Sequence, residues 1–397
     1  MPSSFGNRIR VTLFGQSHSA AMGAVIDGLP AGFPVDTVGL AAFMARRAPG
    51  GEFATKRREA DEVEFLSGLV DAAAFTDGSP GRAADSGFAA REQNAMPPGA
   101  SPVPTGASLV TCGAPVAFLI RNTDARSADY AKLRDIPRPS HADFTAYLKY
   151  HGFHDIRGGG QFSGRLTAPL CVAGYLCKTL LARRGVTVIS HIASIGGITD
   201  TPLDPMRLDE TYAVRMNDPF PVLDEQARIQ MQSAIRDAAH TGDSLGGVIE
   251  CGIYGFPSGH GGPFFGGIEG TLSQALFAIP AVKGVEFGAG FDFARMRGSE
   301  ANDPYTIDSS GAARPASNRC GGILGGISSG MPILFRAAFK PTPSIPREQE
   351  SVSLSGHTKV PLVIGGRHDP CIVPRTAVVC EAAAALALMN IEDETIE

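Results

Sequence analysis

Glycine constrains this chain more than any other residue type. It accounts for 48 of the 397 residues, whereas tryptophan is absent. Because glycine has no Cβ atom, it permits tight turns and lets the backbone approach a ligand or another strand closely, so this density argues against a simple helical bundle. No segment contains the phosphate-binding pattern GxxxxGK[ST], and none has the spacing of a dinucleotide fingerprint after a clean strand. The glycines concentrate in "RGGGQFSG" (157–164), "GHGGPFFGG" (259–267), "GGILGGISSG" (321–330) and "GGRHDP" (365–370).

Strand and helix patterns are interleaved irregularly along the chain. Residues 8–15 alternate polar and apolar side chains, and residues 23–32 form another short apolar run, so the two predict a β-hairpin. A long helical pattern at 164–185 contains Pro169, near which we expect the regular helix to begin. Because no clean β–α–β repeat is present, the pattern favours an α+β fold. Further helices are expected within 36–47, 224–244 and 375–393, and further strands within 116–120, 186–198, 246–255 and 285–293.

Two polar segments interrupt these patterns. Residues 75–108 are rich in Gly, Pro, Ala and Ser, which is typical of a surface insertion outside the core. Residues 297–319 are also polar, and we expect a mobile loop there. Since this loop leads directly into the glycines at 321–330, it is a candidate lid over a glycine-lined site. Chain length alone favours two or three domains as a first expectation.

The overall charge limits the classes of partner. A formal net charge of −5 gives no reason to expect nucleic acid or an anionic membrane surface, so an anionic ligand has to be held by local arginines. The first ten residues contain no signal-peptide core, and no apolar run reaches membrane-spanning length. The seven cysteines form no CxxC pair and fall mostly in apolar runs. We therefore expect reduced, buried thiols in a cytoplasmic protein without a membrane partner.

His18 lies between two serines, directly after the strand pattern that ends at Gly15. One interpretation is that it caps a turn together with Ser17 and Ser19, because serine hydroxyls satisfy the backbone of a loop. The other is that it titrates near neutral pH at the tip of a strand and reaches a ligand in a cleft. This stretch alone leaves both open.

Arginines recur beside the glycine-rich segments. A guanidinium group matches a carboxylate or phosphate with two parallel hydrogen bonds, so arginines next to bare glycine backbone suit a polyanionic small ligand, whereas a single arginine more often forms a surface ion pair. A metal site is less favoured, because the fixed positive charge repels a cation. The clusters are Arg46–Arg47, Arg57–Arg58, Arg138 with His141 and Asp143, Arg157 with Ser163 and Arg165, and Arg367 with His368 and Asp369.

Several uncommon strings follow one another in a distinctive order. They are "FGQSHS", "KRREADEVEFLSG", "NTDARSADY", "RPSHADF", "RGGGQFSGR", "IPAVKGVEFG", "GGILGGISSG", "FKPTPSI" and "GRHDPC". Together they resemble the chorismate synthase family over nearly the whole chain, and residues 75–108 are the main unmatched piece. The resemblance implies one domain over 1–397, an α+β fold with helical layers sandwiched between antiparallel β-sheets, and a homotetramer.

The resemblance also implies a reaction. Members of the family are carbon–oxygen lyases of the shikimate pathway, which supplies aromatic amino acids. They remove phosphate and a ring proton from 5-enolpyruvylshikimate 3-phosphate in an anti-1,4-elimination that gives chorismate. The cofactor is reduced FMN, although the reaction has no net redox change, and NADPH is needed only if the enzyme reduces its own flavin.

The same resemblance assigns roles to residues. His18 would protonate the departing phosphate. Ser17 would orient His18 or touch the flavin. His141 would protonate or steady the reduced flavin. Asp369 would accept a proton from the flavin N5, which then serves as the base for the ring hydrogen. Substrate-facing arginines would be Arg47, Arg138, Arg165 and Arg367, and the FMN pocket would comprise Gln161, Phe162, Ser163, Pro280, Ala281, Gly325, Lys340, Pro341, Thr342, Pro343, Ser344 and Arg367.

Some positions depart from the family's pattern. Residues 161–163 read Gln-Phe-Ser where Arg-Ser-Ser is common, which motivates a second hypothesis, a flavin-binding relative with impaired catalysis. A third hypothesis is an anion-binding metalloenzyme. Retention of His18, His141 and Asp369 favours an active enzyme, since a protein without catalysis has no physical need for three titratable groups in loops. The other departures are Gln16, Ser19, Glu52 and Leu166.

Overall fold

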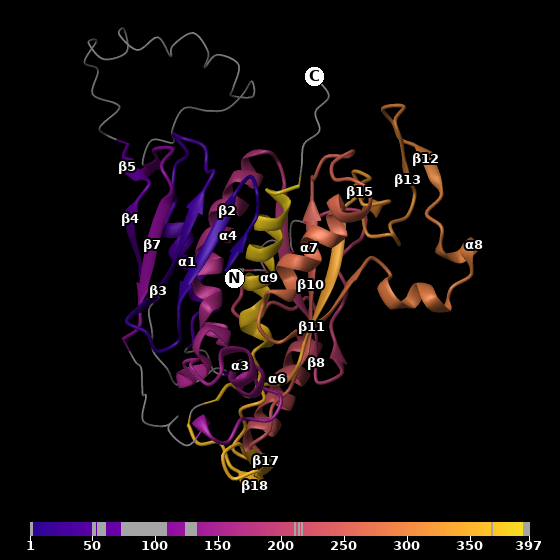
Figure 1. Ribbon diagram of the computed structural model, residues 1–397. Helices are drawn as coiled ribbons and strands as arrows, with labels where there is room; N and C mark the ends of the chain where they lie inside the picture. The colour runs from indigo at the N-terminus through magenta and orange to yellow at the C-terminus, as the bar shows by residue number, and fades with distance from the viewer. Residues whose placement is uncertain are drawn as a thin grey trace, which may run out of the picture.

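Two five-stranded antiparallel sheets enclose a layer of helices in the computed structural model of the chain (Figure 1). This arrangement confirms the expected α+β class. The surface insertion expected at 75–108 lies outside the described residues. The structure describes residues 3–49, 53, 61–72, 109–123, 133–209, 212, 215, 217–366 and 368–391.

The first sheet has the strand order β1-β2-β3-β7-β4. Thr12 lies opposite Val25 in the β2–β3 pair, which confirms the predicted hairpin. Successive side chains of a strand point to opposite faces, so Met22 and Ile26 are buried toward the helices whereas Val25 is exposed. The strands are β1 (Ser4–Phe5), β2 (Arg10–Gly15), β3 (Ala21–Asp27), β7 (Val116–Arg121) and β4 (Val63–Ser67).

The second sheet has the order β11-β16-β10-β8-β9, and one of its faces packs against helices α7 and α9. The strand expected at 285–293 ends at Phe287. Gly288 there adopts φ +55°, and the chain continues as a 3-10 turn, η6 (Gly290–Arg295), so the last part of that prediction is wrong. The strands are β11 (Val282–Phe287), β16 (Ile333–Phe339), β10 (Gly247–Tyr254), β8 (Thr187–Ile195) and β9 (Ile198–Thr199).

Helices α4 and α9 lie against each other in the middle of the molecule (Figure 1). A Cβ atom on Gly174 would lie 2.3 Å from the Cβ of Ala382, so this close approach requires glycine. α4 begins two residues before Pro169, close to the expected start. The helices of this layer are α1 (Thr37–Arg47), α4 (Thr167–Arg183), α7 (Ile268–Phe277) and α9 (Val373–Leu388).

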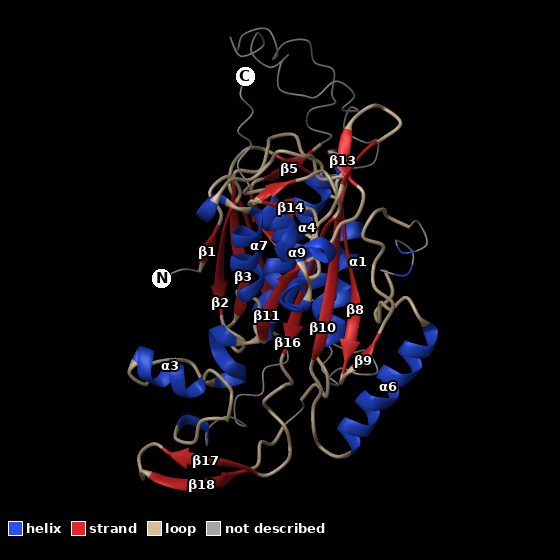
Figure 2. Ribbon diagram, turned by 90° about the vertical axis from the view of Figure 1, so that its right-hand side faces the viewer, coloured by secondary structure: helices blue, strands red, loops and turns tan. Residues whose placement is uncertain are grey.

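The remaining elements lie outside the layers, with α3, α6 and the β17–β18 hairpin at one end of the molecule (Figure 2). The segment 297–319 carries a short helix and a two-stranded hairpin rather than an irregular loop; its mobility stays a prediction. These outer elements are α3 (Asp143–Tyr150), α6 (Glu225–His240), α8 (Gly298–Ala301), β5 (Leu69–Asp71), β6 (Leu109–Thr111), β12 (Tyr305–Ile307), β13 (Ala313–Pro315), β14 (Ile323–Leu324), β15 (Ile327–Ser328), β17 (Gln349–Ser353), β18 (Thr358–Leu362), η3 (Arg157–Phe162), η4 (Gly164–Leu166) and η5 (Phe264–Gly266).

Two further sequence expectations concern the whole chain. All seven cysteines are free thiols, but Cys112 is exposed and Cys320 is partly buried, so the expectation of burial is wrong for these two. In the part of the chain that the structure describes, no helix has the length and apolar character needed to cross a membrane.

Candidate active site

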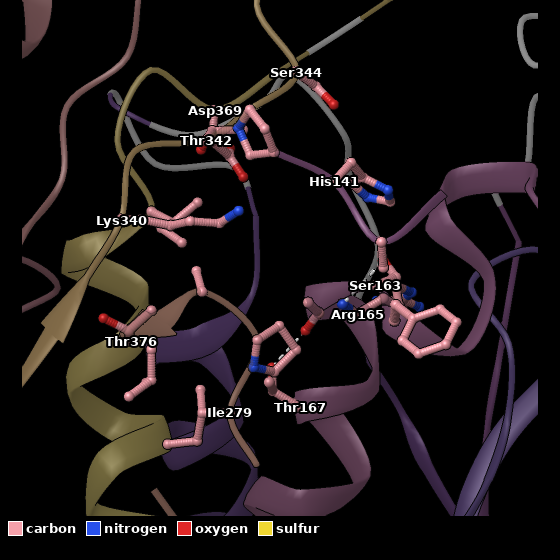
Figure 3. Close-up of a pocket in the computed structure, with 18 of the residues that line it drawn as sticks. His141, Ser163, Arg165, Thr167, Ile279, Lys340, Thr342, Ser344, Asp369 and Thr376 are labelled. Atoms are coloured by element: carbon pink, nitrogen blue, oxygen red, sulfur yellow. Dashed lines mark hydrogen bonds between the residues drawn. The ribbon is translucent and has the colours of Figure 1, made fainter. Parts of the chain in front are cut away.

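A cavity of about 860 Å³ opens between the ends of α1, α4 and α9. A volume of this size suits a small-molecule ligand. Figure 3 shows Lys340 pointing toward the middle of the cavity, His141 on the opposite side and Ile279 on the wall. Six cationic side chains line the cavity among the described residues, which are Arg47, Arg138, Arg165, Lys283, Lys340 and Arg375.

His18 lies in the loop after β2 and lines this cavity. Although it lies at the tip of a strand, where a side chain is ordinarily exposed, its side chain is only 7% exposed. The cause is the glycine loop at 158–160, whose three residues all have positive φ. A Cβ atom on Gly158 would lie 2.2 Å from His18 Nδ1 and 2.5 Å from Ser17 Oγ. Bare backbone therefore covers both side chains, as only glycine permits.

His141 lies on the other side of the same loop. A Cβ atom on Gly159 would approach His141 Nε2 to 3.2 Å, so consecutive glycines separate the two histidines. His141 Nδ1 lies 2.6 Å from Asp143 Oδ1. An ionised carboxylate only accepts hydrogen bonds, so Nδ1 carries the proton and Nε2, on the side of Gly159, does not need one. The sequence places Asp143 beside His141 but does not say which nitrogen it binds.

Arg138 completes this cluster. Its Nε and Nη2 donate to the two oxygens of Asp143 at 2.7 and 2.9 Å, and its Nη1 lies 3.3 Å from Ser344 Oγ. Burial opposes ionisation of Asp143, but the hydrogen bonds from Arg138 and His141 outweigh it and hold the pKa of that carboxyl well below its usual range. Asp143 is therefore a fixed anion that orients the imidazole of His141.

Arg47 and Arg165 share a carboxylate that the sequence reasoning missed. Arg47 Nη2 donates to one oxygen of Asp61, and Arg165 Nη1 donates to the other. The Asp61 side chain is fully buried. Its burial opposes ionisation, yet the charges of the two arginines outweigh this effect and lower its pKa. The result is a buried cluster with more positive than negative charge at the cavity wall.

Asp369 also pairs with an arginine. Arg375 Nη1 donates to Asp369 Oδ2 at 2.9 Å, and Arg375 Nε donates to the backbone oxygen of Arg47 at 2.8 Å. Arg375 was expected only as the start of a helix. It links the carboxylate assigned to proton transfer with the arginine at the end of α1.

One wall of the cavity suits a planar, anionic cofactor. Ile279, Pro280 and Ala281 present apolar surface. The ring of Phe162 lies 6.4 Å from that of Tyr150, the last residue of α3. Lys340 donates to the backbone oxygen of Ser140, and its pKa is lowered by burial and by Lys283. Apolar surface for a ring beside a lysine for an anionic group fits a flavin mononucleotide.

The structure brings together most of the expected site residues. Gly325 is an exception, because it lies on the β14–β15 hairpin and does not line the cavity. Ser17 is buried behind His18, and Pro341 lies next to the wall without lining it. Arg367 lies outside the described residues. The residues that line the cavity as expected are His18, Arg47, Arg138, His141, Gln161, Phe162, Ser163, Arg165, Pro280, Ala281, Lys340, Thr342, Pro343, Ser344 and Asp369.

Comparisons with known proteins agree on one family. The chorismate synthase family model matches residues 9–83 and 101–392. The chorismate synthases of Korarchaeum cryptofilum and Dehalococcoides mccartyi are 40% and 41% identical to the chain, covering 97% and 98% of it and 96% of each relative. A crystal structure of a chorismate synthase superimposes with a TM-score of 0.65 at 26% identity, over 97% of this chain and 92% of that one.

Proposed function

Because the chain belongs to the chorismate synthase family and has the function of a chorismate synthase, we propose that its cavity binds 5-enolpyruvylshikimate 3-phosphate beside reduced FMN and releases phosphate and chorismate. One observation supports placing the reaction in this cavity. His18 and His141 flank the glycine loop at 158–160 in a cavity lined by cationic side chains. This arrangement supplies proton donors and anion ligands at one place, as a lyase acting on a phosphate ester requires.

The arginines bind the substrate. It carries two carboxylates and a phosphate, and the overall charge of the chain is negative, so affinity has to come from local cations. Arg47 and Arg165 carry two positive charges, and Asp61 neutralises only one of them. We assign this pair, together with Arg138 and Arg367, to the anionic groups of the substrate.

His18 protonates the departing phosphate. The released phosphate carries more negative charge than the ester, so a donor at the leaving oxygen lowers the barrier. Burial beneath the glycine loop keeps water from His18 and holds its ring at the cavity. General acid catalysis of this kind contributes about 10²–10⁴ to the rate. Ser17, buried beside His18, orients the ring.

The wall of Ile279, Pro280 and Ala281 and the charge of Lys340 would hold the FMN. When bound, reduced FMN would supply an electron-rich ring for the elimination. His141 lines the cavity and exchanges a proton there through Nε2, because Asp143 holds Nδ1. Asp369, held by Arg375, keeps a carboxylate at the cavity as a proton acceptor. NADPH is required only if the protein reduces its own flavin.

We also propose a homotetramer in the cytoplasm. Large apolar side chains on the turns η5 and η6 and on β12 are largely exposed, as expected of a surface that another copy covers. These are Phe264, Phe265, Phe291, Tyr305 and Ile307.

One assay tests the reaction. Purified protein is mixed with 5-enolpyruvylshikimate 3-phosphate and chemically reduced FMN without oxygen, and chorismate and phosphate are both measured. Equal amounts of the two products are expected. Tight FMN binding without product would mean a relative with impaired catalysis, and neither binding nor product would refute the proposal.

A further inference from the structure

We propose that Asp61 is a positioning residue for substrate binding. Its buried carboxylate holds the guanidinium groups of Arg47 and Arg165 side by side, so that both present N–H donors to one oxyanion of the substrate. The identity of the substrate rests on the proposed function. The role of Asp61 rests on the geometry of its contacts with the two arginines.

The position of Asp61 relative to the cavity supports this role. Arg47 and Arg165 line the cavity, whereas Asp61 does not, so the carboxylate lies behind the two guanidinium groups. Arg47 is only 2% exposed, and its buried Nε has no hydrogen-bond partner among the described residues. A buried donor without a partner is costly unless a ligand satisfies it. The unsatisfied Nε therefore indicates a place for an acceptor such as a carboxylate or phosphate oxygen.

The balance of charge among Asp61, Arg47 and Arg165 supports the same role. Two guanidinium groups in a buried site repel each other, and an anion between them removes this repulsion. Asp61 supplies one negative charge for two positive ones, so the cluster stays a cation toward the cavity. Because both arginines favour its ionised form, Asp61 keeps this charge at neutral pH.

Three separate segments of the chain bring Arg47, Arg165 and Asp61 together. Arg47 ends α1, Arg165 lies in η4 before α4, and Asp61 precedes β4. Asp61 has φ +48°, a left-handed conformation that aspartate tolerates better than most residues. From this position its carboxylate accepts hydrogen bonds from both arginines. Asn122 Oδ1 accepts a hydrogen bond from Arg165 Nε at 3.2 Å, which fixes the plane of that guanidinium group.

A second buried carboxylate provides a matched control. Glu381 is fully buried and accepts hydrogen bonds from Arg46 Nη2 at 2.7 Å and from Lys178. None of these three residues lines the cavity. Glu381 thus has the same charge environment as Asp61, one carboxylate with two cations, but no access to a ligand.

The experiment compares Asp61→Asn with Glu381→Gln. Dissociation constants of 5-enolpyruvylshikimate 3-phosphate are measured by calorimetry on the full-length protein without reduced FMN, and KM and kcat are measured with it. For D61N we expect about tenfold weaker binding and a KM raised equally, with kcat within about threefold of wild type, because oriented donors bind substrate and transition state alike. E381Q is expected to lower the melting temperature without raising KM. D61E, which restores the charge, is expected to recover part of the affinity.

Each outcome decides the inference. D61N that binds substrate as tightly as wild type, or that loses kcat at unchanged KM, would overturn it. If D61N fails to fold, Arg47→Lys keeps the charge beside Asp61 but removes Nε, and a wild-type KM in that variant would overturn it as well. Wild-type binding without turnover would refute the proposed function alone, while the comparison of dissociation constants still decides the role of Asp61. Absence of wild-type binding would refute both.

Discussion

His141 and His191 both pair with an aspartate, but their surroundings differ. His141 Nδ1 lies 2.6 Å from Asp143, and His191 Nδ1 lies 2.9 Å from Asp200. The second nitrogen of His191 lies 2.9 Å from Glu250 Oε2, and its side chain is 0% exposed. The side chain of His141 is 17% exposed and lines the cavity.

The difference decides what each imidazole does. With both nitrogens bound to carboxylates, His191 has no site from which to exchange a proton with a ligand. Burial favours its neutral form, but the hydrogen bonds and charges of Asp200 and Glu250 outweigh burial and raise its pKa. His191, in β8, is therefore a structural cation that pairs with Asp200, just after β9, and with Glu250 in β10. In His141, by contrast, Asp143 binds only the Nδ1 side of the ring, and the side chain lines the cavity.

Among the variants that test this comparison of histidines, His18→Ala is expected to have the largest effect, which is a loss of kcat. Removal of the proton donor is expected to lower kcat by about 10²–10⁴. The protein is expected to stay folded, because His18 lies in the loop between β2 and β3 and contributes to no strand or helix. Steady-state chorismate formation measures the loss, and circular dichroism verifies the fold. Wild-type activity in this variant would remove His18 from the mechanism.

His191→Gln is expected to have the opposite pattern, a loss of folding stability with unchanged activity. The variant leaves two carboxylates without their cation, and breaking a buried ion pair costs about 3 kcal/mol of folding stability. The cluster does not touch the cavity, so kcat and KM of the folded fraction are expected to stay unchanged. Urea unfolding measures the first effect and the activity assay the second. A loss of kcat without a loss of stability would contradict the structural role.

Asp143→Asn tests the orientation of His141. The amide cannot hold Nδ1–H as strongly as the carboxylate does, so the ring loses its fixed tautomer. We expect kcat to fall by about 10- to 100-fold, by analogy with residues that orient a functional histidine. His141→Ala serves as the reference, and its loss is expected to be at least as large. Equal activity of D143N and wild type would show that Asp143 does not orient the ring.

The sequence predicted local features well and long-range contacts poorly. The hairpin of β2 and β3 and the helices α4 and α6 follow from patterns within one segment, and the structure contains them. Asp61 escaped notice because its partners lie 14 and 104 residues away, and nothing in a local pattern links them. The burial of His18 was missed for the same reason, since the loop that covers it lies at 158–160.

The family resemblance supplied the roles that local patterns do not. It directed attention to His141 and Asp369, but not to Asp143 or Arg375, which hold them. His191 went unnoticed, because a histidine inside a strand pattern resembles a core residue, and its two carboxylate partners come from other segments. Contacts that depend on tertiary packing thus mark the limit of sequence reasoning here.

The smallest expected effect is a difference in the pH dependence of stability. The folded-state pKa of His191 is raised above its unfolded value of about 6.5, so its contribution is fully present below that pH. As the pH rises from about 6.5 through the folded pKa, the imidazolium loses its proton and the contribution is lost. Wild-type stability is therefore expected to fall toward alkaline pH more steeply than that of H191Q, because both proteins share every other titrating group. Urea unfolding of both proteins between about pH 6 and 9 measures the difference, and parallel curves would mean that His191 folds in its neutral form.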